Sequence, residues 1–105
     1  MRKVWVIGHV AEDVVLKLRG ELLIGQMHFP TEVIHRCGGS TSNIAIGIAS
    51  GPIETGFITY LGNDDAAAFV EPVLQNSNFN PLLITRGDQG TPRCLVVVDE
   101  FGERT

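Results

Sequence analysis

The segment from Gly38 to Ala45, GGSTSNIA, contains the residue types that could bind a small hydroxylated ligand. Paired glycines let the backbone approach a ligand closely and adopt dihedral angles that are closed to other residues. The small polar residues that follow are typical of a helix N-terminus, where their side chains satisfy free backbone N–H groups. Such a helix end also directs N–H groups and a positive dipole at whatever lies there. Asn43 adds an amide that donates and accepts hydrogen bonds, which suits a ligand hydroxyl.

A second candidate is Asp13, in the segment GHVAED that follows the first apolar run. In open α/β sheets ligands bind at the carboxyl ends of the strands, and a carboxylate there could accept hydrogen bonds from two adjacent sugar hydroxyls. Simpler interpretations stay open for both candidates. Gly38-Gly39 could be only a tight turn with Asn43 as a cap, and Asp13 only a solvated loop carboxylate.

Short apolar or alternating segments predict the strands that must position these residues. They are residues 4–7, 13–18, 31–37, 56–61, 82–85 and 94–98. The run 4–7 is continuously apolar, which is typical of a parallel strand buried on both faces. Residues 99–102 have the composition of a hairpin turn, with 103–105 starting a returning strand. That pattern predicts further polypeptide beyond Thr105.

Two helices are expected between the strands. The segment 44–49 fits either a strand or a helix, and the polar residues before it favour the helix. A second helix should start after Asp64 as its N-cap, and Pro72 should kink or end that helix early. Strands that alternate with helices indicate an α/β fold with a parallel sheet.

Composition and charge exclude several classes of protein. The chain has 105 residues, 44% hydrophobic and 19% charged, which suits one small globular domain. A net charge of −4 without a basic stripe argues against a nucleic-acid partner. No apolar run approaches the roughly 20 residues that cross a bilayer, and none resembles a signal peptide, so no membrane partner is expected. Cys37 and Cys94 are expected to be free thiols in a cytoplasmic protein.

Other chemistries lack their residues. Neither a GxGxxG dinucleotide loop nor a P-loop is present. His9, His28 and His35 with Cys37 do not make a ligand set, so no metal site is expected. Nothing near Cys37 in the sequence would depress its pKa, which argues against a nucleophile. Arg93 either points toward the ligand or is a surface residue, and we favour the surface.

Four segments, in order, resemble the N-terminal part of the ribokinase-like (PfkB) carbohydrate kinases. They are the run 4–8 with Asp13, Gly38-Gly39 with Asn43 and Ala45, the run 55–58 with Gly62-Asn63-Asp64, and the run 91–99 with residues 102–104. The resemblance implies a ribokinase-like α/β fold, present in part: a parallel sheet with flanking helices plus strands of a small β lid. The lid strands would lie near residues 13–18, 31–37 and 94–105.

By the same resemblance, the chain is the N-terminal, substrate-binding segment of an ATP-dependent sugar or nucleoside kinase. Asp13 and Asn43 would hold ligand hydroxyls, with Gly38 and Gly39 allowing close approach, and lid closure would exclude water. ATP and Mg²⁺ are implied, but their sites and the catalytic base would belong to a C-terminal part that this chain lacks. The alternative is a truncated, inactive ligand-binding or dimerisation fragment, including a homodimer through the lid strands.

Four positions, in three places, depart from the family pattern. Ala11 replaces an asparagine that contacts the sugar in ribokinase, Ser40-Thr41 replaces a Lys-Gly pair, and Ala67 replaces a turn glycine. These differences argue against ribose specificity and leave the class of sugar, sugar acid or nucleoside open.

Overall fold

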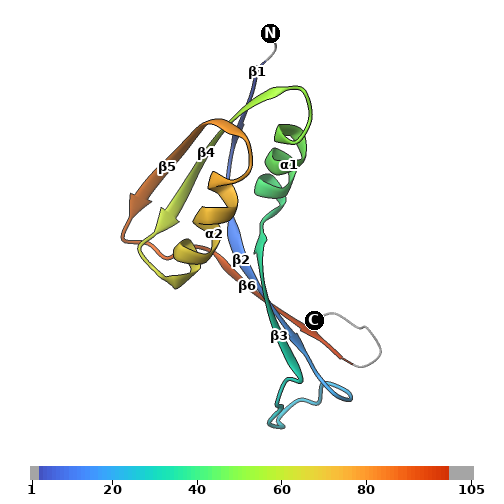
Figure 1. Cartoon of the computed structure of the whole chain (residues 1–105). Helices are drawn as coiled ribbons and strands as arrows, with labels where there is room; N and C mark the ends of the chain where they lie inside the picture. Colours follow the sequence, from blue (N-terminus) through green and yellow to red (C-terminus); the bar gives the residue numbers. More distant parts are fainter. Residues whose placement is uncertain (1–2, 100–105) are drawn as a thin grey trace.

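The computed structural model describes residues 3–99, which form two small sheets and two helices (Figure 1). The parallel sheet has the order β1 (Lys3–Ile7), β4 (Glu54–Gly62), β5 (Phe79–Gly87). The second sheet has the order β3 (Glu32–Gly38), β2 (Ala11–Lys17), β6 (Arg93–Val98). The helices are α1 (Ser40–Ala49) and α2 (Asp65–Gln75). The predicted α/β fold is therefore confirmed, including the helix over residues 44–49.

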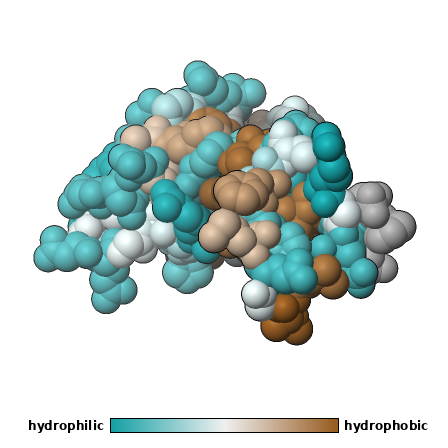
Figure 2. Space-filling view, turned by 90° about the horizontal axis from the view of Figure 1, so that it is seen from below, coloured by the Kyte–Doolittle hydropathy of each residue, from teal (hydrophilic) through white to brown (hydrophobic). Residues whose placement is uncertain are grey.

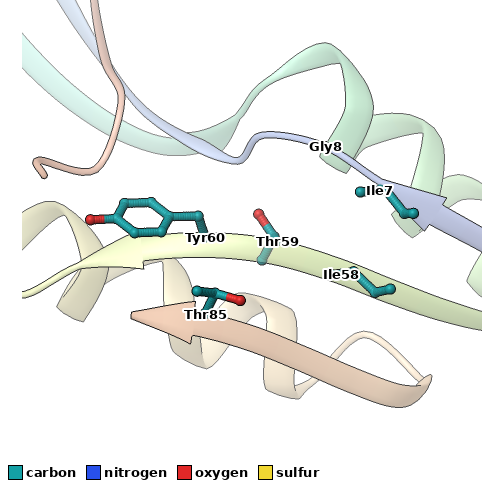
Figure 3. A pocket seen from close by; sticks show the side chains of 6 residues that line it. All are labelled: Ile7, Gly8, Ile58, Thr59, Tyr60 and Thr85. Carbon is teal, nitrogen blue, oxygen red and sulfur yellow. The ribbon is translucent and has the colours of Figure 1, made fainter. Parts of the chain in front are cut away.

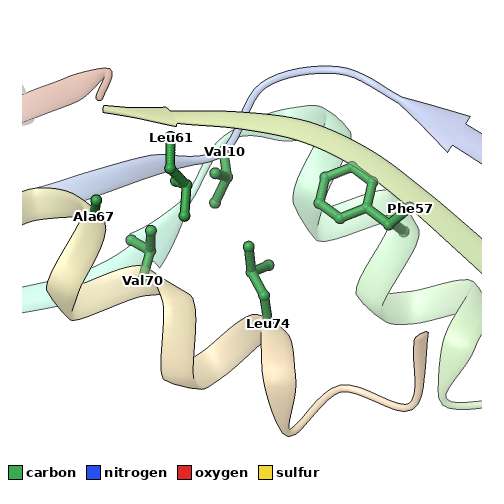
Figure 4. Close-up of a cluster of buried hydrophobic side chains, with 7 residues drawn as sticks. Val10, Phe57, Leu61, Ala67, Val70 and Leu74 are labelled. Carbon is green, nitrogen blue, oxygen red and sulfur yellow. The ribbon is translucent and has the colours of Figure 1, made fainter. Parts of the chain in front are cut away.

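The hydrophobic core lies between the parallel sheet and the two helices (Figure 4). Alternate residues of β4, Phe57 and Leu61, are fully buried and face the helices. Ala45 of α1 and Leu74 of α2 pack into the same cluster, together with Val10 from the connection after β1. The core therefore holds both helices on one face of the sheet.

The rest of the described chain does not cover the opposite face of the parallel sheet, which corrects the expectation for residues 4–7. Trp5 is 47% exposed and Ile7 72% exposed, whereas a strand buried on both faces was predicted. The reason is topological, because β1 is an edge strand of this sheet and the helices cover only the other face. Leu83 is also exposed; it lies on β5, which β4 separates from β1.

The second sheet brings together the three segments that the sequence predicted as lid strands. Strand β2 is central, antiparallel to β3 and parallel to β6. The sheet extends away from the core, and the molecule measures 54 Å along its longest axis (Figure 1). A hairpin turn and a returning strand were predicted at residues 99–105. Except for Asp99, these residues lie outside the described part of the chain.

The loop between β2 and β3 exposes several large hydrophobic side chains. Ile24, Met27 and Phe29 are almost entirely accessible to solvent. Figure 2 views the molecule from the end where this loop lies and shows hydrophobic residues interspersed among hydrophilic ones. This end of the second sheet is therefore not covered by the rest of the described chain.

Several predicted bounds differ from those in the structure, and two of them need a physical explanation. Helix α2 does not end at Pro72 but continues to Gln75. Proline lacks an N–H and its ring crowds the carbonyl four residues earlier, but the carbonyl of Pro72 still accepts a hydrogen bond from the Asn76 N–H at 3.1 Å, so the helix continues. Strand β5 is also longer than the predicted 82–85, because its parallel pairing with β4 extends from Phe79 to Gly87.

The core assignment predicts the effect of truncating Leu74. Leu74→Ala should lower the free energy of unfolding by about 2–5 kcal/mol, because it leaves a cavity among fully buried neighbours. Leu95→Ala is the matched control, since Leu95 of β6 is 60% exposed, and it should cost about 1 kcal/mol or less. Urea denaturation followed by circular dichroism measures both. Equal losses would contradict the placement of the core.

Candidate functional site

The connection after β1 and the first turn of α1 lie against each other. A Cβ atom added to Gly8 would come within 2.3 Å of the Thr41 methyl carbon, so only glycine leaves room for this contact. The Gly8 N–H donates to the carbonyl of Ile58 at 3.2 Å, which continues the pairing of β1 with β4 beyond Ile7. The carboxyl end of β1 and the N-terminus of α1 therefore meet.

The structure brings Asp13 together with Gly38. In the β2–β3 pairing Asp13 lies opposite Arg36 and Ala11 lies opposite Gly38, so Asp13 and Gly38 share one face of the sheet. A Cβ atom on Gly38 would lie 2.2–2.4 Å from the three carboxylate atoms of Asp13. The first glycine of the pair therefore makes room for the Asp13 carboxylate itself.

The second glycine determines how α1 begins. Gly39 is the N-cap, with φ 96°, a backbone conformation that favours glycine. In the part of the chain that the structure describes, no side chain caps this helix, which corrects the expectation that the Ser/Thr/Asn cluster satisfies the first N–H groups. Ser42 instead turns back, and its Oγ donates to the carbonyls of Gly38 at 2.5 Å and Gly39 at 2.9 Å. Ser42 thus holds the first turn of α1 against the glycine pair, and the helix N-terminus has no side-chain cap among the described residues.

Asn43 lies in the first turn of α1, and its side chain is exposed. Its backbone N–H donates to the Gly39 carbonyl at 3.0 Å, so it is not the cap of its own helix. Among the described residues, neither the Asn43 amide nor the Asp13 carboxylate has a side-chain hydrogen bond or ion pair. Within the described chain, both groups therefore have free hydrogen-bonding capacity.

Cys37 is partly buried beside this site. Burial raises the pKa of its thiol above the usual range, and the negative charge of Asp13 raises it further. Both effects disfavour the thiolate, which is the nucleophilic form. The environment of Cys37 therefore opposes a nucleophilic role, in agreement with the sequence analysis.

Sequence reasoning did not find the role of Glu12, the residue before Asp13. Its carboxylate is buried and accepts a hydrogen bond from Arg93 Nε at 2.8 Å; its other oxygen lies 3.1 Å from His35 Nδ1. Arg93 was expected to be a surface residue, and half of its side chain is indeed exposed, but its Nε belongs to this buried ion pair. The 81-residue separation of Glu12 and Arg93 explains why no local pattern revealed the contact.

A pocket of about 310 Å³ adjoins Gly8 on the uncovered face of the parallel sheet (Figure 3). It is lined by Ile7, Gly8, Ile58, Thr59, Tyr60 and Thr85. The Tyr60 hydroxyl donates to the Gln89 carbonyl at 2.7 Å. Thr59 Oγ1 is the one buried side-chain oxygen or nitrogen without a partner in the described part of the chain. The volume is near the lower limit for small-molecule pockets.

The predicted turn at Gly62-Asn63-Asp64 connects β4 to α2. Asp64 is the N-cap of α2, as expected, and accepts a hydrogen bond from the Ala67 N–H at 2.9 Å. Its carboxylate also accepts from the backbone N–H and the hydroxyl of Thr91, both at 2.8 Å. The hydrogen bond from the Thr91 N–H is the main cause that lowers the pKa of Asp64, followed by the one from Ala67. Asp64 therefore joins the start of α2 to the chain leading into β6.

Comparison with known proteins shows which family the chain belongs to. The profile of the pfkB family carbohydrate kinases matches residues 1–105. The chain belongs to the PfkB family. Aminoimidazole riboside kinase of Salmonella typhimurium is 31% identical over 107 aligned residues, which cover 100% of this chain and 30% of that protein.

Solved structures show the same fold. Ribokinase from Thermotoga maritima matches with a TM-score of 0.85 and 23% identity, covering 100% of this chain and 35% of its own. Ribokinase from Cryptococcus neoformans, solved in complex with ADP, matches with a TM-score of 0.78 and 22% identity over 33% of its length. The chain thus spans about a third of the length of these PfkB relatives, and its two sheets and two helices are a ribokinase-like arrangement.

Neither a metal-binding cluster nor a membrane-spanning helix is found among the described residues. Residues 3–99 contain no group of three or more His, Cys, Asp or Glu side chains placed to hold a metal ion. The described residues therefore do not offer a ligand set that would fit a Mg²⁺ ion, and we assign none of them to Mg²⁺. Within the same range, neither helix is long and apolar enough to cross a membrane.

The contact between Asp13 and Gly38 predicts a selective effect of a methyl group. Gly38→Ala should lower the free energy of unfolding by about 1–3 kcal/mol, because the short Asp13 side chain must leave its position. Gly47→Ala in α1 is the control: nothing lies within 4 Å of the added atom, and it should raise stability by about 0.5–1 kcal/mol. Denaturant unfolding measures both changes. In an Asp13→Ala background the cost of Gly38→Ala should largely disappear, and an unchanged cost would contradict the contact.

The lowered pKa of Asp64 predicts acid sensitivity with a definite sign. Because the folded-state pKa is below the unfolded value of about 3.9, the stabilisation is complete above that value. It is lost as the pH falls through the folded-state pKa. Unfolding free energies measured from pH 6 to pH 2 should therefore fall less steeply in Asp64→Asn than in the wild type. An unchanged slope in Asp64→Asn would contradict the assignment.

Proposed function

We propose that the chain is the substrate-binding part of an ATP-dependent sugar or nucleoside kinase that transfers phosphate to a substrate hydroxyl. The observation that carries this proposal is the Asp13 carboxylate over Gly38, beside a helix N-terminus without a side-chain cap. A carboxylate accepts hydrogen bonds from hydroxyls, and the Asn43 amide in the first turn of that helix can donate and accept. Membership of the PfkB family supplies the reaction class.

The second sheet acts as the lid over this ligand in our proposal. It carries Asp13 on β2 and Gly38 on β3, and it projects from the core that holds α1 (Figure 1). Movement of this sheet toward the N-terminus of α1 would exclude water from the reacting hydroxyl, so that phosphate is not lost to hydrolysis.

We further propose that ATP, Mg²⁺ and the catalytic base are held by residues outside this 105-residue chain. The uncovered face of the parallel sheet supports the idea that more protein packs there, because Trp5, Ile7 and Leu83 present an apolar surface to solvent. The similar ribokinase with bound ADP is about three times as long as the part that matches. In this view the chain supplies acceptor recognition, and the phosphoryl donor is bound elsewhere.

Ligand titration of the 105-residue chain tests the proposed function. Heteronuclear NMR with ribose, fructose and adenosine should show saturable shifts at Asp13, Gly39 and Asn43 for at least one of them. Asp13→Ala should weaken that affinity by about tenfold or more, since a hydrogen bond to a charged group is worth about 1.5–3 kcal/mol. Asn43→Ala should weaken it by about two- to tenfold, since a hydrogen bond to a neutral group is worth about 0.5–1.5 kcal/mol. Asp88→Ala, in the turn after β5, is the control and should leave the affinity unchanged.

Two results would overturn this proposal. Unchanged affinity in both Asp13→Ala and Asn43→Ala would reject the ligand site. Phosphorylation of a sugar by the purified chain with ATP and Mg²⁺ alone would show that the base and the nucleotide site are within it.

A further inference from the structure

Glu12 is a charged side chain that the proposed function does not use, and it is almost completely buried. It is 4% exposed, whereas its two partners, Arg93 and His35, have side chains that are about half exposed. A buried carboxylate is strongly unfavourable unless it is paired and hydrogen-bonded. Both oxygens of Glu12 have a partner, one from each neighbouring strand. The carboxylate therefore links β2 to β3 and to β6 at one point.

Glu12 and Asp13 are consecutive in β2, so their side chains point to opposite faces of the second sheet. Glu12 lies opposite Cys37 on β3 and Arg93 on β6. Its face is the one toward α2, because the His35 ring contacts the Phe69 ring of that helix at 5.8 Å between centroids. The other face carries Asp13 and Gly38.

Two adjacent carboxylates create an ambiguity in register. A slip of one residue in a strand moves every side chain to the other face, and β2 would then present Glu12 rather than Asp13 beside Gly38. In that register Asp13 would be turned toward α2, and its shorter side chain would have to reach Arg93 and His35. The pattern of hydrophobic residues opposes such a slip only weakly, because Val14, Val15 and Leu16 form a continuous apolar run.

We propose that Glu12 is a positioning residue: its pairing with Arg93 and His35 fixes β2 so that Asp13, and not its neighbour, faces the ligand at Gly38. The ligand part of this inference rests on the proposed function. The placement of Asp13 does not, since it can be measured without any ligand.

The test uses the 105-residue chain with Glu12→Gln, Arg93→Gln, Arg93→Lys and Glu32→Gln. Glu32→Gln is the matched control, because it removes an exposed ion pair with Lys17 (3.5 Å) between the same two strands. Cross-strand NMR contacts between Asp13 and Arg36 report the register directly. Affinity for the sugar or nucleoside selected above reports the position of the Asp13 carboxylate.

Glu12→Gln and Arg93→Gln should weaken the NMR contacts between Asp13 and Arg36, or split them into two sets that correspond to two registers. The same two changes should reduce ligand affinity by about tenfold or more, because a displaced Asp13 carboxylate would lose its charged hydrogen bonds to the ligand. Arg93→Lys keeps the positive charge and should preserve most of both properties. Glu32→Gln should preserve them fully.

The outcomes separate this inference from the proposed function. If the wild type binds none of the three ligands, the proposed function fails, and the NMR contacts still decide the role of Glu12. If Glu12→Gln keeps a single Asp13–Arg36 register and full affinity, the positioning role is wrong. If Glu12→Gln does not fold, the two substitutions of the half-exposed Arg93 decide, and equal behaviour of Arg93→Gln and Arg93→Lys would reject the inference.

Discussion

The pairing of β2 with β3 is the constraint on which the candidate site depends. It sets Ala11 opposite Gly38 and Asp13 opposite Arg36, so that the Asp13 carboxylate lies over the one residue of β3 that has no side chain. Gly39, the next residue, adopts the φ of 96° with which the chain leaves β3 and enters α1. One stretch of backbone thus makes room for the carboxylate and places the helix N-terminus beside it.

A second close contact joins the site to the core. The Thr41 side chain packs against Gly8 so closely that any Cβ atom at position 8 would clash with it. Two residues later, Val10 is fully buried in the cluster that contains residues of β4 and α2. Two contacts therefore fix the position of α1. Strand β3 of the second sheet leads directly into the glycine pair before the helix, and Gly8 at the end of β1 packs against Thr41 in its first turn. Packing density makes such a contact rigid, because a displaced Thr41 would leave neighbouring atoms without partners.

Local signals predicted the parts of the fold that depend on neighbours in sequence. The glycine pair, the polar residues after it and Asp64 marked both helix starts, and apolar runs marked the strands. The sequence could not reveal that Glu12 meets Arg93, because that contact requires the parallel pairing of β2 with β6 across 81 residues. The exposure of Trp5 and Ile7 was missed for a related reason: an apolar strand indicates burial, but the residues that would cover it are not its neighbours in sequence. The Ser/Thr/Asn cluster was misread in detail, since Ser42 bonds backward to the glycine carbonyls and not forward to free N–H groups.

The exposure of Asn43 and the partial exposure of Asp13 explain why the second sheet must be stiff. Hydrogen bonds to ligand hydroxyls contribute little while water competes for the same groups, and they strengthen only when water is excluded. In the proposed kinase that exclusion comes from closing the second sheet toward α1. Bending of this three-stranded sheet during such a movement would shift Asp13 away from the ligand. The two hydrogen-bonded partners of Glu12 oppose this bending one residue away from Asp13, where the strand carries the group that must stay in place.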